Sequence, residues 1–177
     1  MGLYVERALF VIAPRHFGKS TTLRSMFRDD RFHTEGKVPT KLKLPDDYAI
    51  GHDRRLYLRL TSPHESDETL PDFIAKTRGK MPGGRWCFAG PLHPGSFKQM
   101  PDAMTTIGAF IKAFEPERVR VAILCPNHQG VDVDGFLPGR DLLADMHSID
   151  DRVEVMSLDV RKRNTNGLVL ADFFDFT

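Results

Sequence analysis

Short apolar runs recur along the chain, and segments of different pattern separate them. Residues 8–12 (ALFVI) form a continuous apolar run, which is typical of a strand covered on both faces. Shorter or alternating apolar patterns predict four more strands, at residues 54–60, 85–89, 118–124 and 152–158. Strands that alternate with helical segments predict an α/β fold with a mainly parallel sheet of about five strands.

Several of the intervening segments carry apolar residues at helical spacing. Leu23, Met26 and Phe27 stand at positions i, i+3 and i+4, which predicts a helix over residues 20–27. Weaker or longer patterns of the same kind predict helices at 66–77, 97–114 and 140–149. Residues 37–48 and 126–139 are predicted to be loops. The tail at 168–176 is apolar and is expected either to add an edge strand or to dock on the core. Neither a linker nor a shift in composition divides the 177 residues, so we expect a single domain, 1–177.

The segment between the first predicted strand and the first predicted helix carries the clearest chemistry. It consists of Ala13, Pro14, Arg15, His16, Phe17, Gly18, Lys19 and Ser20, followed by Thr21 in the first turn of the helix. Its form, A-x-x-x-x-G-K-S, differs by one residue from the phosphate-binding motif G-x-x-x-x-G-K-[ST]. In that motif, the glycine lets backbone N–H groups approach the phosphates, the lysine reaches the β- and γ-phosphates, and the hydroxyl binds Mg²⁺. The segment therefore predicts a site for the phosphate tail of a nucleoside triphosphate with Mg²⁺, with Ser20 as the metal ligand.

The amino-acid sequence of this segment also resembles that of a known family. Pro14 to Ser20 is similar to the P-R-x-F-G-K-S loop of AAA-ATPase-like and STAND-related ATPases, within the P-loop NTPase superfamily. The resemblance implies a three-layer P-loop fold that binds ATP through Lys19 and Ser20. The chain departs from the family because Ala13 replaces the first glycine and the later landmarks are not recognisable. ATP is preferred to GTP because no N-K-x-D motif, which reads guanine, occurs in the sequence.

For the second acid of such a site, which holds Mg²⁺ or orients the attacking water, two segments offer candidates. Asp159 directly follows the last predicted strand, where an aspartate is also common as a helix cap or turn residue. The cluster of Glu65, Asp67 and Glu68 follows the second predicted strand, where acids are also common at a solvated helix start. The catalytic candidates are therefore Lys19, Asp159, Glu65 and Asp67.

Two more segments are candidates for contacts with the nucleotide. Arg161 and Asn164 lie in the run 161–167, and in P-loop folds the loop after the last strong strand lies against the base. An arginine can stack on a base, and an asparagine can form hydrogen bonds with the edge of a base. The alternative is that the run 161–167 is a basic, solvated turn that ends in Asn-Gly. Arg140, at the end of the 126–139 loop, is a candidate lid arginine if the protein is a kinase.

Three functions fit these residues. The first is an ATP hydrolase, the second a small-molecule or nucleotide kinase that transfers the γ-phosphoryl group to an acceptor, and the third a nucleotide-dependent switch with little turnover. The expected partners are a nucleoside triphosphate and either a small-molecule acceptor or a protein. Nucleic acid and membrane are not indicated, because the formal net charge is +1 and no apolar run approaches about 18 residues. The two cysteines, Cys87 and Cys125, lie in apolar runs, which favours a reducing cytoplasm.

Overall fold

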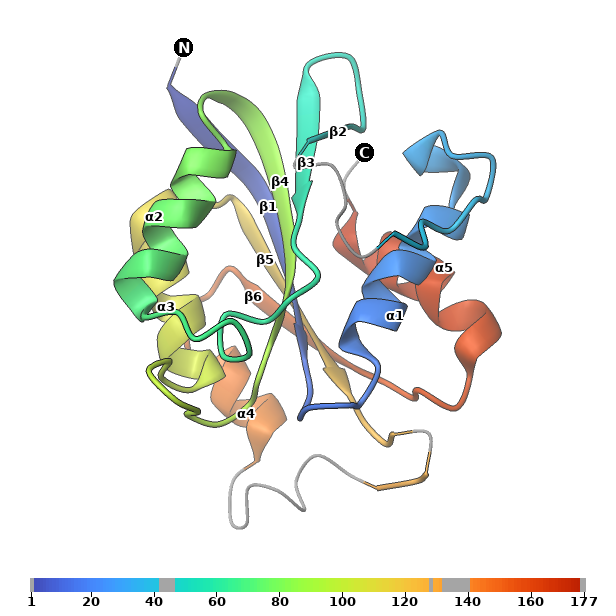
Figure 1. The fold of residues 1–177 in the computed structure, drawn as a ribbon, viewed down its shortest axis with the longest axis vertical. Helices are drawn as coiled ribbons and strands as arrows, with labels where there is room; N and C mark the ends of the chain where they lie inside the picture. Colours follow the sequence, from blue (N-terminus) through green and yellow to red (C-terminus); the bar gives the residue numbers. More distant parts are fainter. Residues whose placement is uncertain (1, 42–46, 128, 132–140, 176–177) are drawn as a thin grey trace.

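The computed structural model describes residues 2–41, 47–127, 129–131 and 141–175. Within them, one sheet of six strands has the order β2-β3-β4-β1-β5-β6 (Figure 1). The strands are β1 (Leu3–Ile12), β2 (Tyr48–Ala49), β3 (Arg54–Leu58), β4 (Gly84–Leu92), β5 (Arg118–Leu124) and β6 (Val153–Leu158). All neighbours pair in parallel except β2 with β3, which are antiparallel. The α/β class and the five expected strands are confirmed, and the two-residue strand β2 is an addition.

Strand β1 lies in the middle of the sheet, between β4 and β5. Residues 8–12 of β1 are all buried, which explains why they form a continuous apolar run in the sequence. After β1 the chain first builds β3 and β4 on one side and then crosses to build β5 and β6 on the other. The carboxyl end of β1 is therefore the topological switch point, where α/β sheets bind their ligands.

Helices cover both faces of the sheet. They are α1 (Lys19–Ser25), α2 (Leu70–Lys80), α3 (Ala103–Phe114), α4 (Leu142–His147) and α5 (Arg163–Phe174), with short 3₁₀ turns η1 (Met26–Arg28) and η2 (Asp30–Phe32) after α1. Figure 1 shows α1 and α5 packed together on one face and α2, α3 and α4 on the other. This arrangement matches the expectation of helices on both sides of a mainly parallel sheet.

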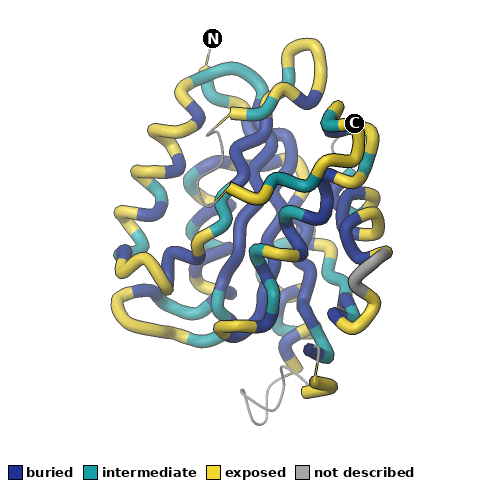
Figure 2. The backbone as a smooth tube through the Cα atoms, turned by 45° about the vertical axis from the view of Figure 1, so that its right-hand side comes forward, coloured by how far each residue is buried: buried dark blue, intermediate teal, exposed yellow. Residues whose placement is uncertain are grey.

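The core lies on both sides of the central strands, which form the dark interior of Figure 2. On the α2–α3 face, Phe10, Phe88 and Phe110 form one aromatic cluster, with ring centroids 4.8–5.5 Å apart. Phe73 of α2 and Phe114 of α3 extend this cluster. Offset and edge-on ring pairs of this kind stabilise a core beyond the area that they bury.

Two helices begin later than their sequence patterns predict, because local side chains cap them. Helix α2 begins at Leu70 rather than at residue 66, since Thr69 and Asp72 form a reciprocal capping box. Helix α3 begins at Ala103 rather than at residue 97, since the Asp102 carboxylate accepts the Thr105 N–H at 2.8 Å. The residues predicted to be helical before these starts, 66–69 and 97–102, lie instead in the loops that follow β3 and β4.

The tail is a helix, so the expectation of an edge strand is wrong. Leu170, Ala171 and Phe174 of α5 are fully buried, which confirms that the tail docks on the core. The alternative of a basic turn closing on Asn166 and Gly167 is also wrong, because both residues lie inside α5. A Cβ at Gly167 would lie 2.1 Å from the Ser25 carbonyl oxygen, so this glycine lets α5 approach α1 closely. Tertiary packing overrides the local turn signal here.

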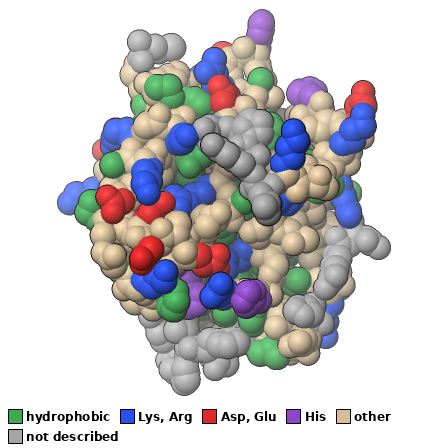
Figure 3. All heavy atoms as spheres, viewed as in Figure 1, with side chains coloured by type: hydrophobic (Ala, Val, Ile, Leu, Met, Phe, Trp, Pro, Cys, Tyr) green, Lys and Arg blue, Asp and Glu red, His purple; other side chains and the backbone are tan. Residues whose placement is uncertain are grey.

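A buried network of charges lies toward the amino ends of the parallel strands. The register of β1 against β4 shifts between Val5 and Arg7, and this bulge contains Glu6. The Glu6 carboxylate is 6 % exposed and forms ion pairs with three arginines: Arg7, Arg54 at 2.8 Å and Arg85 at 3.0 Å. Figure 3 shows that basic and acidic side chains are interspersed on the face turned to the viewer.

No helix in the described part of the chain is long and apolar enough to cross a membrane.

Candidate functional site

The candidate site begins where β1 ends. Residues 13–18 leave the carboxyl end of β1 and lead directly into α1, and the Ala13 N–H donates to the Leu92 carbonyl of β4 at 3.3 Å. Two residues of this segment have left-handed backbone conformations, His16 with φ of 66° and Gly18 with φ of 86°. Gly18 precedes the first helical residue, and its nearest outside neighbour, Val160, would lie 3.8 Å from an added Cβ. The positive φ, rather than crowding, therefore favours glycine at position 18.

Lys19 is the most buried charged side chain of the site, at 5 % exposure. Its Nζ donates to the carbonyl oxygens of Ala13 at 3.0 Å and Pro14 at 2.9 Å, and it lies 3.5 Å from Oε1 of Glu65. Burial lowers the pKa of Lys19; the carboxylate of Glu65 partly offsets this, and the nearby guanidinium of Arg15 lowers the pKa further. An ammonium in this setting gains from any additional anion.

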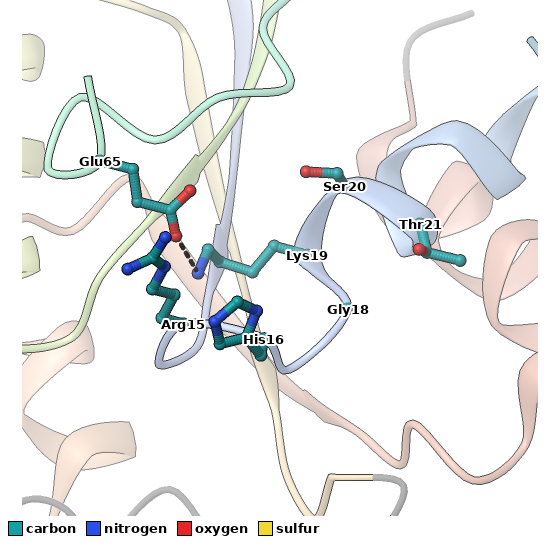
Figure 4. A pocket seen from close by; sticks show the side chains of 7 residues that line it. All are labelled: Arg15, His16, Gly18, Lys19, Ser20, Thr21 and Glu65. Carbon is teal, nitrogen blue, oxygen red and sulfur yellow. Dashed lines mark hydrogen bonds and ion pairs between the residues drawn. The ribbon is translucent and has the colours of Figure 1, made fainter. Parts of the chain in front are cut away.

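Above this amine lies an open cavity of about 410 Å³. It is lined by Arg15, His16, Gly18, Lys19, Ser20, Thr21 and Glu65. Figure 4 shows the side chains of Arg15 and Lys19 extending toward the carboxylate of Glu65, and Ser20 and Thr21 on the first turn of α1. The structure therefore brings together most of the sequence-predicted segment with one of the candidate acids, Glu65.

Ser20 is oriented by a backbone acceptor. Its Oγ donates to the Leu60 carbonyl oxygen at 2.8 Å, just beyond the end of β3. Because the hydroxyl proton is directed to this carbonyl, the oxygen lone pairs remain available as ligands for a cation. Hard cations such as Mg²⁺ prefer oxygen ligands of this kind. The geometry of Ser20 therefore fits a metal ligand, although the metal would need further ligands from phosphates and water.

Glu65 is held in the cavity by a rigid turn. The neighbouring Ser62 and His64 are fully buried, and the Glu65 N–H donates to the Ser62 carbonyl at 3.0 Å. His64 Nε2 lies 2.7 Å from the Pro101 carbonyl, so this nitrogen carries the proton and Nδ1 accepts from Ser62 Oγ at 3.2 Å. Burial lowers the pKa of His64 to about 4, so the ring is neutral at pH 7. A histidine so far from the motif in the sequence carried no signal of this positioning role.

The other acids of the same turn face away from the cavity. Asp67 pairs with Lys98 at 3.6 Å and does not line the cavity. Glu68 is buried and pairs with Arg59 at 2.9 Å and Lys76 at 3.1 Å. Burial raises the pKa of Glu68, but the hydrogen bonds and charges of these two partners more than offset it and lower the pKa overall. Of this acidic cluster, Glu65 is the member that reaches Lys19.

Asp159 forms a local turn instead of lining the cavity. Its carboxylate accepts from the Arg161 backbone at 3.0 Å and from the Arg161 guanidinium at 2.9 and 3.0 Å. This hydrogen bonding lowers the pKa of Asp159 to about 2. Asn166 donates to the Asp159 carbonyl at 2.8 Å and ties the turn to α5. The turn still lies beside the candidate site, because Val160 is the neighbour of Gly18 described above.

The remaining predicted residues have other surroundings. Phe17 is 6 % exposed and belongs to the hydrophobic core, as does Ala13, and Pro14 is also buried. The side chain of Asn164 and the whole of Arg140 lie outside the described residues. The structure therefore leaves contacts of Arg161 and Asn164 with a base as a prediction.

Within the described residues, no group of three or more His, Cys, Asp or Glu side chains could hold a metal ion. A cation at Ser20 would thus depend on ligands from a bound phosphate, which is how Mg²⁺ commonly binds in nucleotide sites. No protein-family model, curated protein or solved structure matches this chain. Functional inference therefore rests on the chemistry of the cavity.

Proposed function

We propose that this chain binds the phosphate tail of a nucleoside triphosphate with Mg²⁺, preferably ATP, and hydrolyses it. The observation that carries the proposal is Lys19, a buried ammonium on loop carbonyls at the base of an open cavity. Its charge is only partly matched, by one carboxylate at 3.5 Å. A β- or γ-phosphate oxygen in the cavity would provide the missing charge.

The neighbouring residues provide the other functions that phosphoryl transfer needs. Gly18 allows the backbone to turn under the phosphates, and Ser20 offers its oxygen to Mg²⁺. Glu65, on the opposite wall, is the acid available to accept a proton from an attacking water. In this proposal Asp159 has no direct role, because its carboxylate is occupied by Arg161.

A binding measurement tests the central claim. We expect calorimetric titration in Mg²⁺ to show that the wild type binds a non-hydrolysable ATP analogue more tightly than the corresponding GTP analogue. Lys19→Ala should weaken binding by about 100-fold or more, since charge-assisted contacts to phosphate are lost. Lys112→Ala, an exposed lysine of α3, is the matched control and should bind as the wild type does. Equal affinity in wild type and Lys19→Ala would contradict the proposal.

The second candidate function is a kinase, and the placement of Glu65 favours it. P-loop kinases use an acid that follows the second strand to position or deprotonate the acceptor, and Glu65 follows β3, the second long strand of the parallel sheet. Phosphate release without any added acceptor separates the two enzymes: a hydrolase releases phosphate with water alone, whereas a kinase consumes ATP only with an acceptor. Triphosphate binding without either activity would indicate the third function, a switch.

The role of Glu65 can be measured separately. Glu65→Gln should lower phosphate release by about 100-fold or more, because a base contributes about 10²- to 10⁴-fold. The same change should leave triphosphate affinity equal or tighter, since it removes a carboxylate that repels the phosphates. Asp67→Asn, on the same turn but outside the cavity, is the matched control and should keep wild-type turnover.

A further inference from the structure

We propose that the side chain of Arg15 binds the terminal phosphate and makes the site selective for triphosphates over diphosphates. This inference rests on the proposed function and adds a side-chain role to a residue whose place in the motif concerns only its backbone. It follows from the position of Arg15, its lack of partners and the charges of the cavity.

The position of Arg15 follows from its two neighbours. Pro14 has a restricted φ angle and is buried, and His16 adopts a left-handed conformation with φ of 66°. Arg15 therefore stands at the exposed corner of the loop, and its side chain lines the cavity with Lys19 and Glu65. Figure 4 shows its guanidinium on the same side of the cavity as the Lys19 amine. Its charge acts on Lys19, whose pKa it lowers.

Arg15 differs from the other arginines in its partners. Among the arginines whose side chains the structure describes, it alone forms no hydrogen bond or ion pair with another described residue. By contrast, Arg59, Arg120 and Arg152 each pair with both a carboxylate and a backbone carbonyl. A guanidinium with five donors in a fixed fork and no protein partner is suited to bind a phosphate through two hydrogen bonds.

The charges of the cavity show why a second cation matters. With histidine counted as neutral, the lining side chains carry two positive charges, Arg15 and Lys19, and one negative charge, Glu65. Without Arg15, the side-chain charges of Lys19 and Glu65 would cancel, and the lining side chains would carry no net positive charge for a third phosphate. Lys19 is buried and held by two carbonyls, whereas Arg15 is exposed. We therefore assign the inner phosphates to Lys19 and the terminal one to Arg15.

The test compares two nucleotides in matched variants. Calorimetry in Mg²⁺ would measure the dissociation constants of the non-hydrolysable imido analogue of ATP and of ADP for the wild type, Arg15→Ala and Arg15→Lys. We expect Arg15→Ala to weaken the triphosphate analogue by about 10- to 100-fold and ADP by less than about threefold. Arg15→Lys should lose about 3- to 10-fold for the triphosphate, because it keeps the charge but not the fork.

His16→Asn is the matched control, since His16 also lines the cavity and asparagine tolerates the same left-handed conformation. It should preserve the ratio of the two dissociation constants. Equal losses for both nucleotides in Arg15→Ala, or no loss for either, would overturn the role of Arg15 while the proposed function stands. Failure of the wild type to bind either nucleotide would overturn both. Melting curves should coincide for wild type and Arg15→Ala, because the side chain is exposed and has no partner.

Discussion

Two cavities of similar size lie at opposite ends of the sheet, and they differ in how their charges are satisfied. The cavity at the carboxyl end measures about 410 Å³, and the one at the amino end about 360 Å³. The second is also basic, being lined by Arg54, Arg55 and Arg85. There, however, every arginine already has an acid: Arg54 and Arg85 pair with Glu6, and Arg55 pairs with Asp47 at 3.0 Å.

The comparison teaches that positive charge alone does not define an anion site. At the amino end, each lining arginine already has a carboxylate partner, so a bound phosphate would have to compete with carboxylates for these arginines. At the carboxyl end, Arg15 has no hydrogen bond or ion pair within the described part of the chain, and Lys19 has one carboxylate at 3.5 Å. Buried charges that satisfy one another stabilise a fold only weakly but are costly to break, whereas an unmatched charge is available to a ligand.

The largest expected effect tests the amino end. Glu6→Gln should lower the free energy of unfolding by about 4 kcal/mol, because it removes the shared partner of three guanidinium groups. Urea unfolding followed by the fluorescence of Trp86, which is buried and the single tryptophan, would measure this loss. Glu35→Gln, at an exposed ion pair with Lys37, should change stability by less than about 0.5 kcal/mol. A loss below about 1 kcal/mol in Glu6→Gln would contradict the comparison.

A steric change near the carboxyl end should come next. Gly167→Ala should cost about 3 kcal/mol, because the new methyl group would lie 2.1 Å from the Ser25 carbonyl and would push α5 away from α1. Gly108→Ala in the middle of α3 is the matched control, since its Cβ would meet only Ile149 at 3.9 Å. That variant should instead gain about 0.5–1 kcal/mol from helix propensity. Thermal and urea unfolding of both variants would show whether the two changes have opposite signs.

The turn that holds Glu65 should give a smaller, pH-dependent effect. His64 has a pKa of about 4 in the fold and an ordinary value of 6.5, so between these pH values the unfolded chain binds a proton that the folded chain does not. Stability therefore falls as the pH falls through this window. From pH 7 to pH 5, the wild type should lose about 2 kcal/mol more than His64→Gln in urea unfolding. Parallel losses in the two proteins would show that His64 does not remain neutral.

The smallest effect concerns Lys19 and completes the comparison with Glu6. Lys19→Met should leave the free energy of unfolding unchanged or raise it by about 1 kcal/mol, because burial of the ammonium is only partly offset by Glu65. Urea unfolding without nucleotide would measure this change. A loss above about 2 kcal/mol would mean that Lys19, like Glu6, is primarily a structural charge, and would weaken the distinction between the two ends.

The sequence predicted those parts of the fold and site that are local in the chain. Three consecutive segments form the core of the site: the apolar run of β1, the loop at residues 13–18 and the start of α1. Because they are consecutive, a single stretch of sequence predicts the strand, the loop and the helix. The contact between Lys19 and Glu65 joins residues 46 positions apart. Only the structure separates Glu65 from the other candidate acids, because Asp159 pairs locally with Arg161 and Asp67 pairs with Lys98.

The errors have physical causes that single residues illustrate. Asn166 and Gly167 form a common turn pair, yet Asn166 binds the Asp159 carbonyl and Gly167 packs on Ser25, so both serve the helix α5. Met100 continues the apolar stripe of α3, but it pairs with Phe97 in an isolated bridge before the Asp102 cap. The charge network of Glu6 was not predicted, because its partners come from three separate strands.

The central position of β1 has a consequence for hydrogen exchange. Both edges of β1 are paired, with β4 and with β5, and its residues are buried on both faces, so its amides should exchange only when the whole domain unfolds. The short edge strand β2 has one partner and should open first. The segment that carries Arg15, Gly18 and Lys19 is thus anchored to the slowest-exchanging strand. Deuterium uptake in β2 should therefore proceed, under native conditions, without loss of the cavity's geometry.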